Sequence, residues 1–249
     1  MSLGEIVLLV VAGVAAGAVN AVAGGGSLLT FPALLALGLG SLSANATSTV
    51  GLVWGSGSAL WGYRDRLREI PRSRLVAVVV PSGIGGVVGA QVVVAAGEEV
   101  FDRLVPVLVL GATGLFAAAE PIHRWAKGRI GSGSIVGLAL LQLAVAVYGG
   151  FFGAGIGILM LAAFSLTGET DVHRANALKS LAALVINGAA TASFLWAGQA
   201  QLGLALLLAI AATAGGRWGA GFALSLGPGR VRQIVVGIGL AIGLGQLIR

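Results

Sequence analysis

A run of three glycines near the N-terminus is the first stretch of the sequence that could bind a ligand. Gly24, Gly25 and Gly26 can adopt positive φ angles and expose their backbone N–H groups. Ser27 follows, and its hydroxyl could cap a helix that begins there. A helix N-terminus carries about half a positive charge and unpaired N–H donors. Together with Asn20, this pattern predicts a site that binds an anion through the backbone.

A second glycine-rich stretch lies in the other half of the chain. Gly153, Gly155 and Gly157 follow Tyr148 and precede another short apolar segment. Glycines in an apolar chain can also serve only to let helices pack closely. Because the two stretches occupy corresponding places, we favour the functional interpretation and include Gly155 and Gly157 in the anion site.

Lys179 is the one charged residue in the apolar stretch from 175 to 216. It follows Asp171 by eight residues, about 12 Å along a helix that rises 1.5 Å per residue. A cation near the centre of a bilayer costs roughly 2.5–3.5 kcal/mol on insertion scales. We therefore expect Lys179 to contact the anion. In the alternative interpretation, its long side chain reaches back to the membrane surface.

Two Ala-Asn-Ala segments, at 44–46 and 175–177, align the two halves of the chain. The alignment pairs Asn45 with Asn176, and Ser48 with Lys179. Amide and hydroxyl groups can replace the hydration shell of a substrate, so Asn45, Ser48 and Asn176 join the candidate site. The alternative is that they hold helices together in lipid. Further polar groups on the second of these helices are Ser180, Asn187 and Thr191.

Residues for most catalytic chemistry are missing from the sequence. There are no cysteines, which excludes disulfides, thiolate catalysis and cysteine-bound metals, and the two histidines argue against a zinc site. We find no nucleophile elbow, phosphate-binding P-loop or pair of carboxylates within an apolar segment. The sequence therefore predicts neither an enzyme, nor a metal site, nor a cofactor.

The composition indicates that the protein lies in a membrane. Of 249 residues, 57% are hydrophobic and 10% are charged, against about 25% charged in an average soluble domain. The net charge of +6 would suggest nucleic acid in a soluble protein. Here the basic residues lie between long apolar runs, where membrane topology and anionic lipid headgroups explain them better. We expect an all-α, multi-pass protein of a prokaryotic plasma membrane, with the lipid bilayer and a small anion as partners and no nucleic acid.

Six apolar segments are long enough for a transmembrane helix, which needs about 20 residues. They are residues 43–62, 75–97, 104–120, 175–198, 202–224 and 230–248. Segments 5–39 and 134–168 are too long for one span, and the glycines interrupt them. The sequence thus predicts two repeats, at 1–129 and 130–249. Each holds a Gly-broken helix, re-entrant or hairpin-like, and three transmembrane helices.

The direction of the chain depends on whether the broken segments cross the membrane. If both cross, the termini lie inside, and Arg217, Arg230 and Arg232 lie outside. If both are re-entrant hairpins, the termini lie outside and the most basic loops are all inside, which satisfies the positive-inside rule better. We expect the hairpin arrangement, which inverts one half relative to the other. Both breaks should then face the protein interior.

Three motifs of the chain resemble the sulfite exporter TauE/SafE family. They are GAVNAVAGGGSLLTFP at 17–32, ANATST at 44–49 and GAGIG at 153–157. The resemblance implies a secondary carrier for sulfur-containing anions such as sulfite or organosulfonates. We expect two inverted repeats whose breaks meet near the membrane midplane, with alternating access by rocking of one repeat against the other. An anion channel using the same site is the alternative, and the oligomeric state, a homodimer included, is left open.

Overall fold

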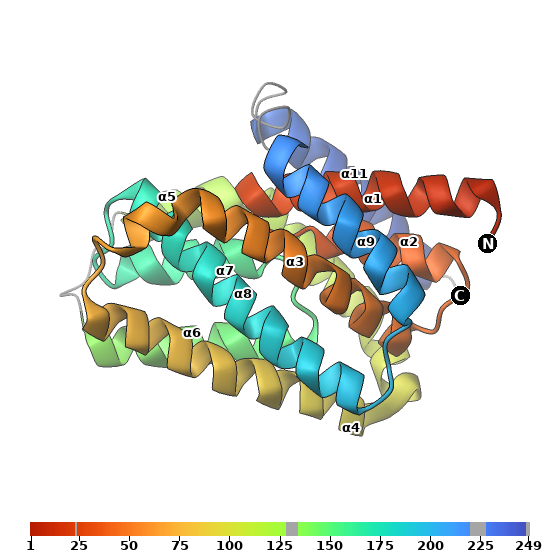
Figure 1. Ribbon diagram of the computed structural model, residues 1–249, viewed down its shortest axis with the longest axis horizontal. Helices are drawn as coiled ribbons and strands as arrows, with labels where there is room; N and C mark the ends of the chain where they lie inside the picture. Colours follow the sequence, from red (N-terminus) through yellow and green to blue (C-terminus); the bar gives the residue numbers. More distant parts are fainter. Residues whose placement is uncertain (23, 128–133, 220–227, 248–249) are drawn as a thin grey trace.

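The computed structural model describes residues 1–22, 24–127, 134–219 and 228–247, and every regular element in them is helical (Figure 1). The fold is therefore all-α, as expected. The elements are α1 (Leu3–Val22), α2 (Ser27–Ala36), α3 (Ser41–Leu67), α4 (Arg72–Ala117), α5 (Ala119–Lys127), α6 (Ile135–Phe151), α7 (Ile156–Leu166), α8 (Val172–Trp196), α9 (Leu202–Ala214), the π-helix η1 (Gly215–Gly219) and α11 (Pro228–Leu247).

The link expected between the apolar segments 75–97 and 104–120 is reduced to one non-helical residue, Gly97. The acidic residues 98–103 were expected to link two spans, but they are helical and belong to α4. The helix is interrupted at Gly97 alone, with φ 77° and ψ 174°, a conformation that favours glycine. α4 therefore consists of two helical segments that meet at Gly97 (Figure 1). The boundary between residues 129 and 130, and the ends of the expected spans at 220–224 and 248, lie outside the described residues.

The chain doubles back at both glycine-rich stretches. α2 packs against α1, and a Cβ added to Gly26 would lie 2.6 Å from the carbonyl oxygen of Ala16. α7 likewise packs against α6, where a Cβ on Gly149 would lie 3.3 Å from the Ile156 side chain. Both broken segments are thus helical hairpins, which is the geometry required by the re-entrant arrangement with both termini outside.

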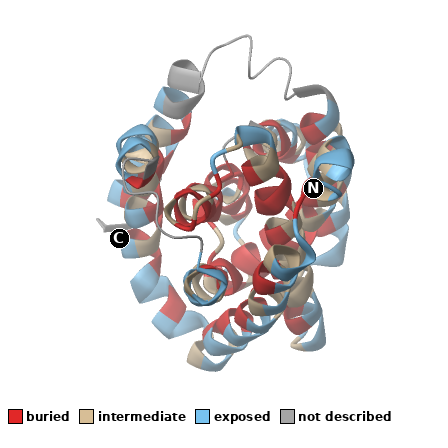
Figure 2. Ribbon diagram, turned by 90° about the vertical axis from the view of Figure 1, so that its left-hand side faces the viewer, coloured by how far each residue is buried: buried red, intermediate tan, exposed pale blue. Residues whose placement is uncertain are grey.

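The outer surface of the bundle is apolar, while many polar side chains lie inside. Val76, Val80 and Ile84 follow one another at four-residue intervals on α4, and each is more than 50% exposed. Leu202 and Leu206 do the same on α9. Buried residues gather toward the middle of the bundle (Figure 2). The buried polar side chains include Thr30, Asn45, Thr47, Ser48, Gln142, Lys179 and Ser180. Such exposed apolar stripes suit a lipid environment.

Three helices of the described residues, α1, α4 and α8, are long and apolar enough to cross a membrane. The 46-residue α4 contains the Gly97 interruption, so its length comes from two segments. Together with the apolar outer surface, these helices identify a membrane protein.

Small residues bring the two halves into close contact at two helix crossings. A Cβ on Gly13 of α1 would lie 2.7 Å from the Ala211 Cβ on α9. A Cβ on Gly85 of α4 would lie 2.5 Å from the Ala146 Cβ on α6. Glycine permits this approach because it has no side chain. The first helix of each broken segment therefore packs on a helix of the other half.

A buried ion-pair network marks one end of the bundle, which we call the basic end. The side chain of Glu169 is 2% exposed and lies 3.2 Å from Arg74 and 3.1 Å from Arg174. Arg74 also donates to the carbonyl of Thr167 at 2.7 Å. This network holds the loop between α7 and α8 against the start of α4. The arginine-rich end of α3, Arg64–Arg68, lies on the same side.

The opposite end, which we call the acidic end, holds Glu98, Glu99 and Asp102. Glu98 accepts hydrogen bonds from the N–H of Leu42 at 3.1 Å and from Ser41 Oγ at 3.3 Å. A carboxylate at this place favours the N-terminus of α3. α3 thus begins at the acidic end, whereas α8 begins at the basic end and runs the opposite way (Figure 1).

Candidate functional site

The two glycine breaks lie against each other in the protein interior. A Cβ on Gly24 would lie 2.7 Å from the Cα of Gly157, and one on Gly25 would lie 3.7 Å from the nitrogen of Gly155. Gly24 and Gly155 have φ angles of 73° and 78°, which glycine adopts without strain. Because α2 and α7 begin at these breaks, the positive ends of both helix dipoles lie close together.

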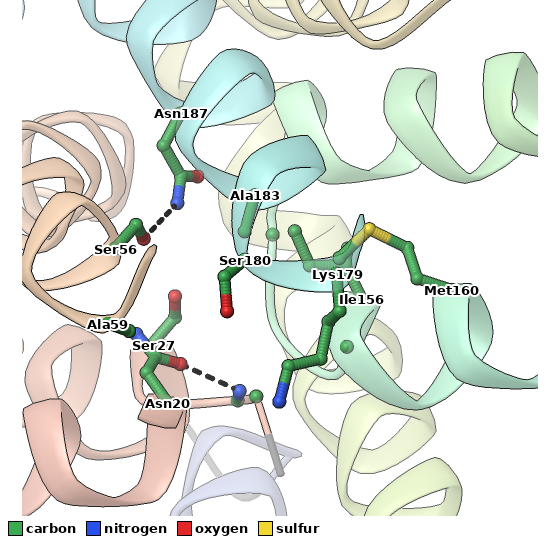
Figure 3. A pocket seen from close by; sticks show the side chains of 14 residues that line it. Asn20, Ser27, Ser56, Ala59, Ile156, Met160, Lys179, Ser180, Ala183 and Asn187 are labelled. Atoms are coloured by element: carbon green, nitrogen blue, oxygen red, sulfur yellow. Dashed lines mark hydrogen bonds between the residues drawn. The ribbon is translucent and has the colours of Figure 1, made fainter. Parts of the chain in front are cut away.

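A small cavity of about 30 Å³ lies beside this contact (Figure 3). Its walls come from α1, α3, α7, α8 and the two breaks. The polar side chains that line it are Asn20, Ser27, Ser56, Lys179, Ser180 and Asn187. Glycines and apolar side chains complete the walls: Gly24, Gly25, Ala59, Gly153, Ile156, Gly157, Met160 and Ala183. The cavity can therefore offer hydroxyl, amide and ammonium groups to a small ligand.

Asn20 holds the first break in place. Its Oδ1 accepts hydrogen bonds from the backbone N–H of Gly25 at 2.9 Å and of Gly26 at 2.7 Å. This corrects two expectations. The two glycine N–H groups are occupied by Asn20 in this structure. Ser27 makes no side-chain cap of α2, because the N–H groups of Leu29 and Thr30 bond to the Gly26 carbonyl. The Ser27 hydroxyl faces the cavity.

Lys179 is the one charged side chain among the described residues that line the cavity. It is 2% exposed, and its amino group points toward the side of the cavity lined by Asn20 (Figure 3). The described residues of the cavity wall include no carboxylate, so the Lys179 side chain gives the cavity a positive character. Ionisable groups buried in membrane proteins commonly mark functional sites, so Lys179 is a candidate contact for a negatively charged ligand.

Gly26, Asn45, Ser48, Gly155 and Asn176 were expected in the site but do not line the cavity. Gly26 packs on α1, and Gly155 is the N-cap of α7. Asn176 donates to the carbonyl of Val172 at 2.9 Å and faces a neighbouring groove.

Asn45 and Ser48 have positioning roles behind the site. Asn45 Nδ2 donates to the carbonyl of Phe151 at 2.9 Å, which ties α3 to the end of α6. The hydroxyls of Ser48 and Thr30 lie 2.6 Å apart and share a hydrogen bond between α3 and α2. Each residue therefore fixes a half-helix to α3, next to the break.

Ser56 is a polar wall residue that our sequence reasoning missed. It accepts a hydrogen bond from Asn187 Nδ2 at 3.4 Å (Figure 3). The signal was present, since the Ala-Asn-Ala alignment pairs Ser56 with Asn187. On α8, Ser180, Ala183 and Asn187 also recur at intervals of three and four residues, which places them on one helix face.

A buried aromatic cluster lies between the first glycine break and the acidic end. The rings of Phe31 and Phe152 meet edge to face at 5.4 Å between centroids, and Phe101 and Phe151 at 5.7 Å. Phe31, Phe101 and Phe152 are at most 1% exposed. Phe31 lies one helical turn beyond Ser27, and Phe101 lies within one turn of Glu98. The cluster therefore links the start of α2 to the acidic end.

Comparison with known proteins shows to which family the chain is similar. A family model described as sulfite exporter TauE/SafE matches residues 9–245. No solved structure matches the chain with significance.

Several curated proteins are similar over nearly their whole length. A probable membrane transporter protein, ORF9, from a Sinorhizobium species is 25% identical over 244 residues, covering 96% of this chain and 91% of that protein. A probable membrane transporter protein of Haemophilus influenzae is 29% identical, covering 93% and 90%. YfcA of Escherichia coli K12, also named a probable membrane transporter protein, is 28% identical, covering 89% and 81%.

Proposed function

The chain belongs to the sulfite exporter TauE/SafE family, and on that premise we propose that this membrane transporter is a secondary carrier for a small sulfur-containing anion. The substrate class is sulfite or an organosulfonate, and the membrane is the plasma membrane of a prokaryote, which the chain crosses several times. The observation that supports a negatively charged substrate is the buried Lys179, in a cavity whose described walls hold no carboxylate.

The cavity suits an oxyanion. The Lys179 ammonium supplies a charge-assisted hydrogen bond, which is stronger than a bond between neutral groups. Hydroxyls of Ser27 and Ser180 add donors on opposite walls. The N-termini of α2 and α7 contribute partial positive charge to the same space. Asn20 preserves the shape of the break and does not need to touch the substrate.

The packing of the two halves supports alternating access. α3 and α8 carry the aligned Ala-Asn-Ala segments and run in opposite directions, as inverted repeats require. α1 packs on α9, and α6 packs on α4, so each half holds the broken helix of the other. Rocking of one repeat against the other around the fixed breaks would open the aromatic cluster and close the opposite side.

The closed aromatic side favours a carrier over a channel. A channel needs a path that is open at both ends at once, whereas the buried rings of Phe31, Phe101 and Phe152 pack together between the first break and the acidic end. The proposed orientation has the basic end in the cytoplasm, which the positive-inside rule supports because Arg64, Arg66, Arg68, Arg72, Arg74 and Arg174 gather there.

Two measurements on the purified protein test the proposal. We expect sulfite, methanesulfonate or sulfoacetate to raise the melting temperature, since a ligand at 100 times its dissociation constant adds about 2.7 kcal/mol of stability. In proteoliposomes whose membrane potential is held at zero, excess unlabelled anion inside should drive transient accumulation of labelled anion, which a channel cannot do without a potential. Stabilisation by cations alone, or flux without counterflow, would overturn the carrier proposal.

A further inference from the structure

A wider groove adjoins the cavity on the side of the basic end. It is an open groove of about 970 Å³, and the side chains that give it chemical character are Trp54, Trp61, Tyr63, His173, Asn176 and Arg217. It is formed by α1, α3, α8, α9 and η1.

The groove and the cavity share a wall. Ala59 lines both spaces. On α1, Asn20 lines the cavity and the next residue, Ala21, lines the groove. On α8, Asn176 in the groove is three residues from Lys179 in the cavity, about 4.5 Å along the helix axis. A ligand in the groove would therefore lie less than one helical turn from the cavity.

The chemistry of the groove matches the same ligand class as the cavity. Arg217 offers a planar guanidinium that can donate two hydrogen bonds to one oxyanion, and His173 and Asn176 add further donors. The described residues that line the groove include no carboxylate. Trp54 and Trp61 supply flat apolar surface for the organic part of a sulfonate.

Arg217 lies in an irregular helical segment. The chain leaves the α-helical path at Gly215 and forms the π-helix η1, Gly215–Gly219. Single π-turns are rare and occur often at functional sites. Here the small Gly215 packs on the backbone of Val14, and Arg217 follows two residues later, on the wall of the groove.

We propose that this groove is the cytoplasmic vestibule of the transporter, in which the anion binds at Arg217 and His173 before it passes Ala59 into the cavity. The role of the groove as an entry route rests on the proposed transport function, whereas anion binding in the groove does not depend on that function. The shared wall at Ala59 makes the groove the candidate access route to the cavity in this conformation. Its positive charge raises the local concentration of anions.

A quenching experiment tests the site without requiring transport. Trp125, Trp196 and Trp218 are replaced by phenylalanine, so that fluorescence reports Trp54 and Trp61. We expect iodide to quench more effectively than neutral acrylamide, and Arg217→Gln to reduce iodide quenching about two- to fivefold. Arg217→Lys should retain most of the effect. Arg68→Gln, which removes an exposed cation outside the groove, should leave the quenching unchanged.

The lipid composition separates a free anion from a lipid headgroup. In vesicles of phosphatidylcholine alone there is no anionic lipid, so an effect of Arg217→Gln there belongs to the free anion. An effect that appears only when phosphatidylglycerol is added would assign the groove to a lipid headgroup and overturn the vestibule. Equal iodide quenching in the parent and Arg217→Gln would also overturn it.

Sided transport assays then test the route. With sulfite as substrate, Arg217→Gln should raise the KM about two- to fivefold when substrate is supplied at the cytoplasmic face, with little change from the opposite face. A change of equal size from both faces would contradict a one-sided vestibule. If no anion is transported but the quenching result holds, the proposed function fails while the anion site stands.

Discussion

Asn187 Nδ2 donates a hydrogen bond to Ser56 Oγ at 3.4 Å, and the Ala-Asn-Ala alignment pairs these two residues, which lie 131 residues apart in the chain. The same offset relates Asn45 to Asn176 and Ser48 to Lys179. Equivalent residues of two repeats approach each other only near the axis that relates them. Because both residues also line the cavity, the contact supports a substrate site next to a two-fold axis between α3 and α8.

Replacement of Lys179 by methionine tests the charge at the centre of the proposed site. Lys179→Met keeps a similar volume and removes a buried charge, so we expect the melting temperature to be unchanged or higher. Anion affinity should fall by about 1.5–3 kcal/mol, the usual contribution of a hydrogen bond to a charged group, or roughly 10- to 150-fold. Isothermal titration with sulfite measures this loss.

Ser48→Ala is the matched control, because Ser48 is equivalent to Lys179 in the other half. It removes the hydrogen bond to Thr30 and should reduce stability by about 0.5–1.5 kcal/mol without a comparable loss of affinity. Unchanged affinity in a well-folded Lys179→Met variant would show that Lys179 does not contact the anion.

Two substitutions of Asn20 separate its structural role from the charge of the cavity. Asn20→Ala leaves the N–H groups of Gly25 and Gly26 without their acceptor, and we expect it to destabilise the protein by about 0.5–2 kcal/mol, as for a lost helix cap. Asn20→Asp keeps the acceptor but adds a carboxylate that competes for Lys179, so it should fold and bind sulfite more weakly. Melting curves and binding isotherms of both variants check this, and tight binding by Asn20→Asp would contradict an anion site here.

Hydropathy and glycine spacing predict most of the fold. The helices follow the long apolar runs, and α2 and α7 are short because a glycine break precedes each of them. Gly97 shows where this reasoning ends. The acidic residues after it suggested a loop, but one glycine at φ 77° is sufficient to interrupt α4. Charge patterns report where a chain meets water, and they do not report how many residues a turn requires.

The candidate site was predicted in part. Lys179 was found because a lone charge in an apolar run is costly, and the glycines because they break helices. The partner of the Gly25 and Gly26 N–H groups was expected to be the anion, and only the hairpin geometry brings the Asn20 amide oxygen to them. The hydrogen bond from Asn45 to the carbonyl of Phe151 spans 106 residues, so no local pattern could show it.

Asp171 gives the protein a stability that depends on pH. Its carboxylate accepts hydrogen bonds from the backbone N–H of Arg174 at 2.9 Å and of His173 at 2.8 Å, at the start of α8. The hydrogen bond from Arg174, aided by that from His173 and by their charges, lowers the pKa of Asp171 below its usual value. Because the folded-state pKa is the lower one, this stabilisation is present above the unfolded pKa of about 3.9 and is lost as the pH falls through the folded value.

We therefore expect Asp171→Ala to melt below the parent at neutral pH, with a difference that shrinks once the pH falls below about 4. Asp171→Asn, which keeps an uncharged cap, should show no such pH dependence relative to Asp171→Ala. Melting temperatures measured across the acid range check this. A difference between the parent and Asp171→Ala that stays constant through the acid range would rule out the carboxylate as its source.

Cysteine labelling tests the orientation of the chain, which has no natural cysteine. The N-terminus lies on the same side as the acidic end (Figure 1). We expect Ser2→Cys and Arg103→Cys to react with an impermeant maleimide added outside cells, because the basic end should face the cytoplasm. Arg68→Cys and Arg124→Cys should react only after the membrane is opened. Reversed accessibility of all four positions would place the basic end outside.

Three glycine substitutions test whether the contact between the two breaks is necessary for binding. Gly24 and Gly38 both have positive φ, 73° and 85°, so alanine at either should cost roughly 1–2 kcal/mol. They differ in their surroundings, since a Cβ at Gly38 meets nothing within 4 Å, whereas one at Gly24 would lie 2.7 Å from the Cα of Gly157. Gly38→Ala should therefore keep anion binding, and Gly24→Ala should lose it together with additional stability.

Gly26 has a helical φ of −55°, and a Cβ there would lie 2.6 Å from the Ala16 carbonyl oxygen. Any loss of binding in Gly26→Ala therefore comes from steric contact alone. Equal sulfite binding by Gly24→Ala and Gly38→Ala would show that the breaks serve only packing and that the anion binds elsewhere.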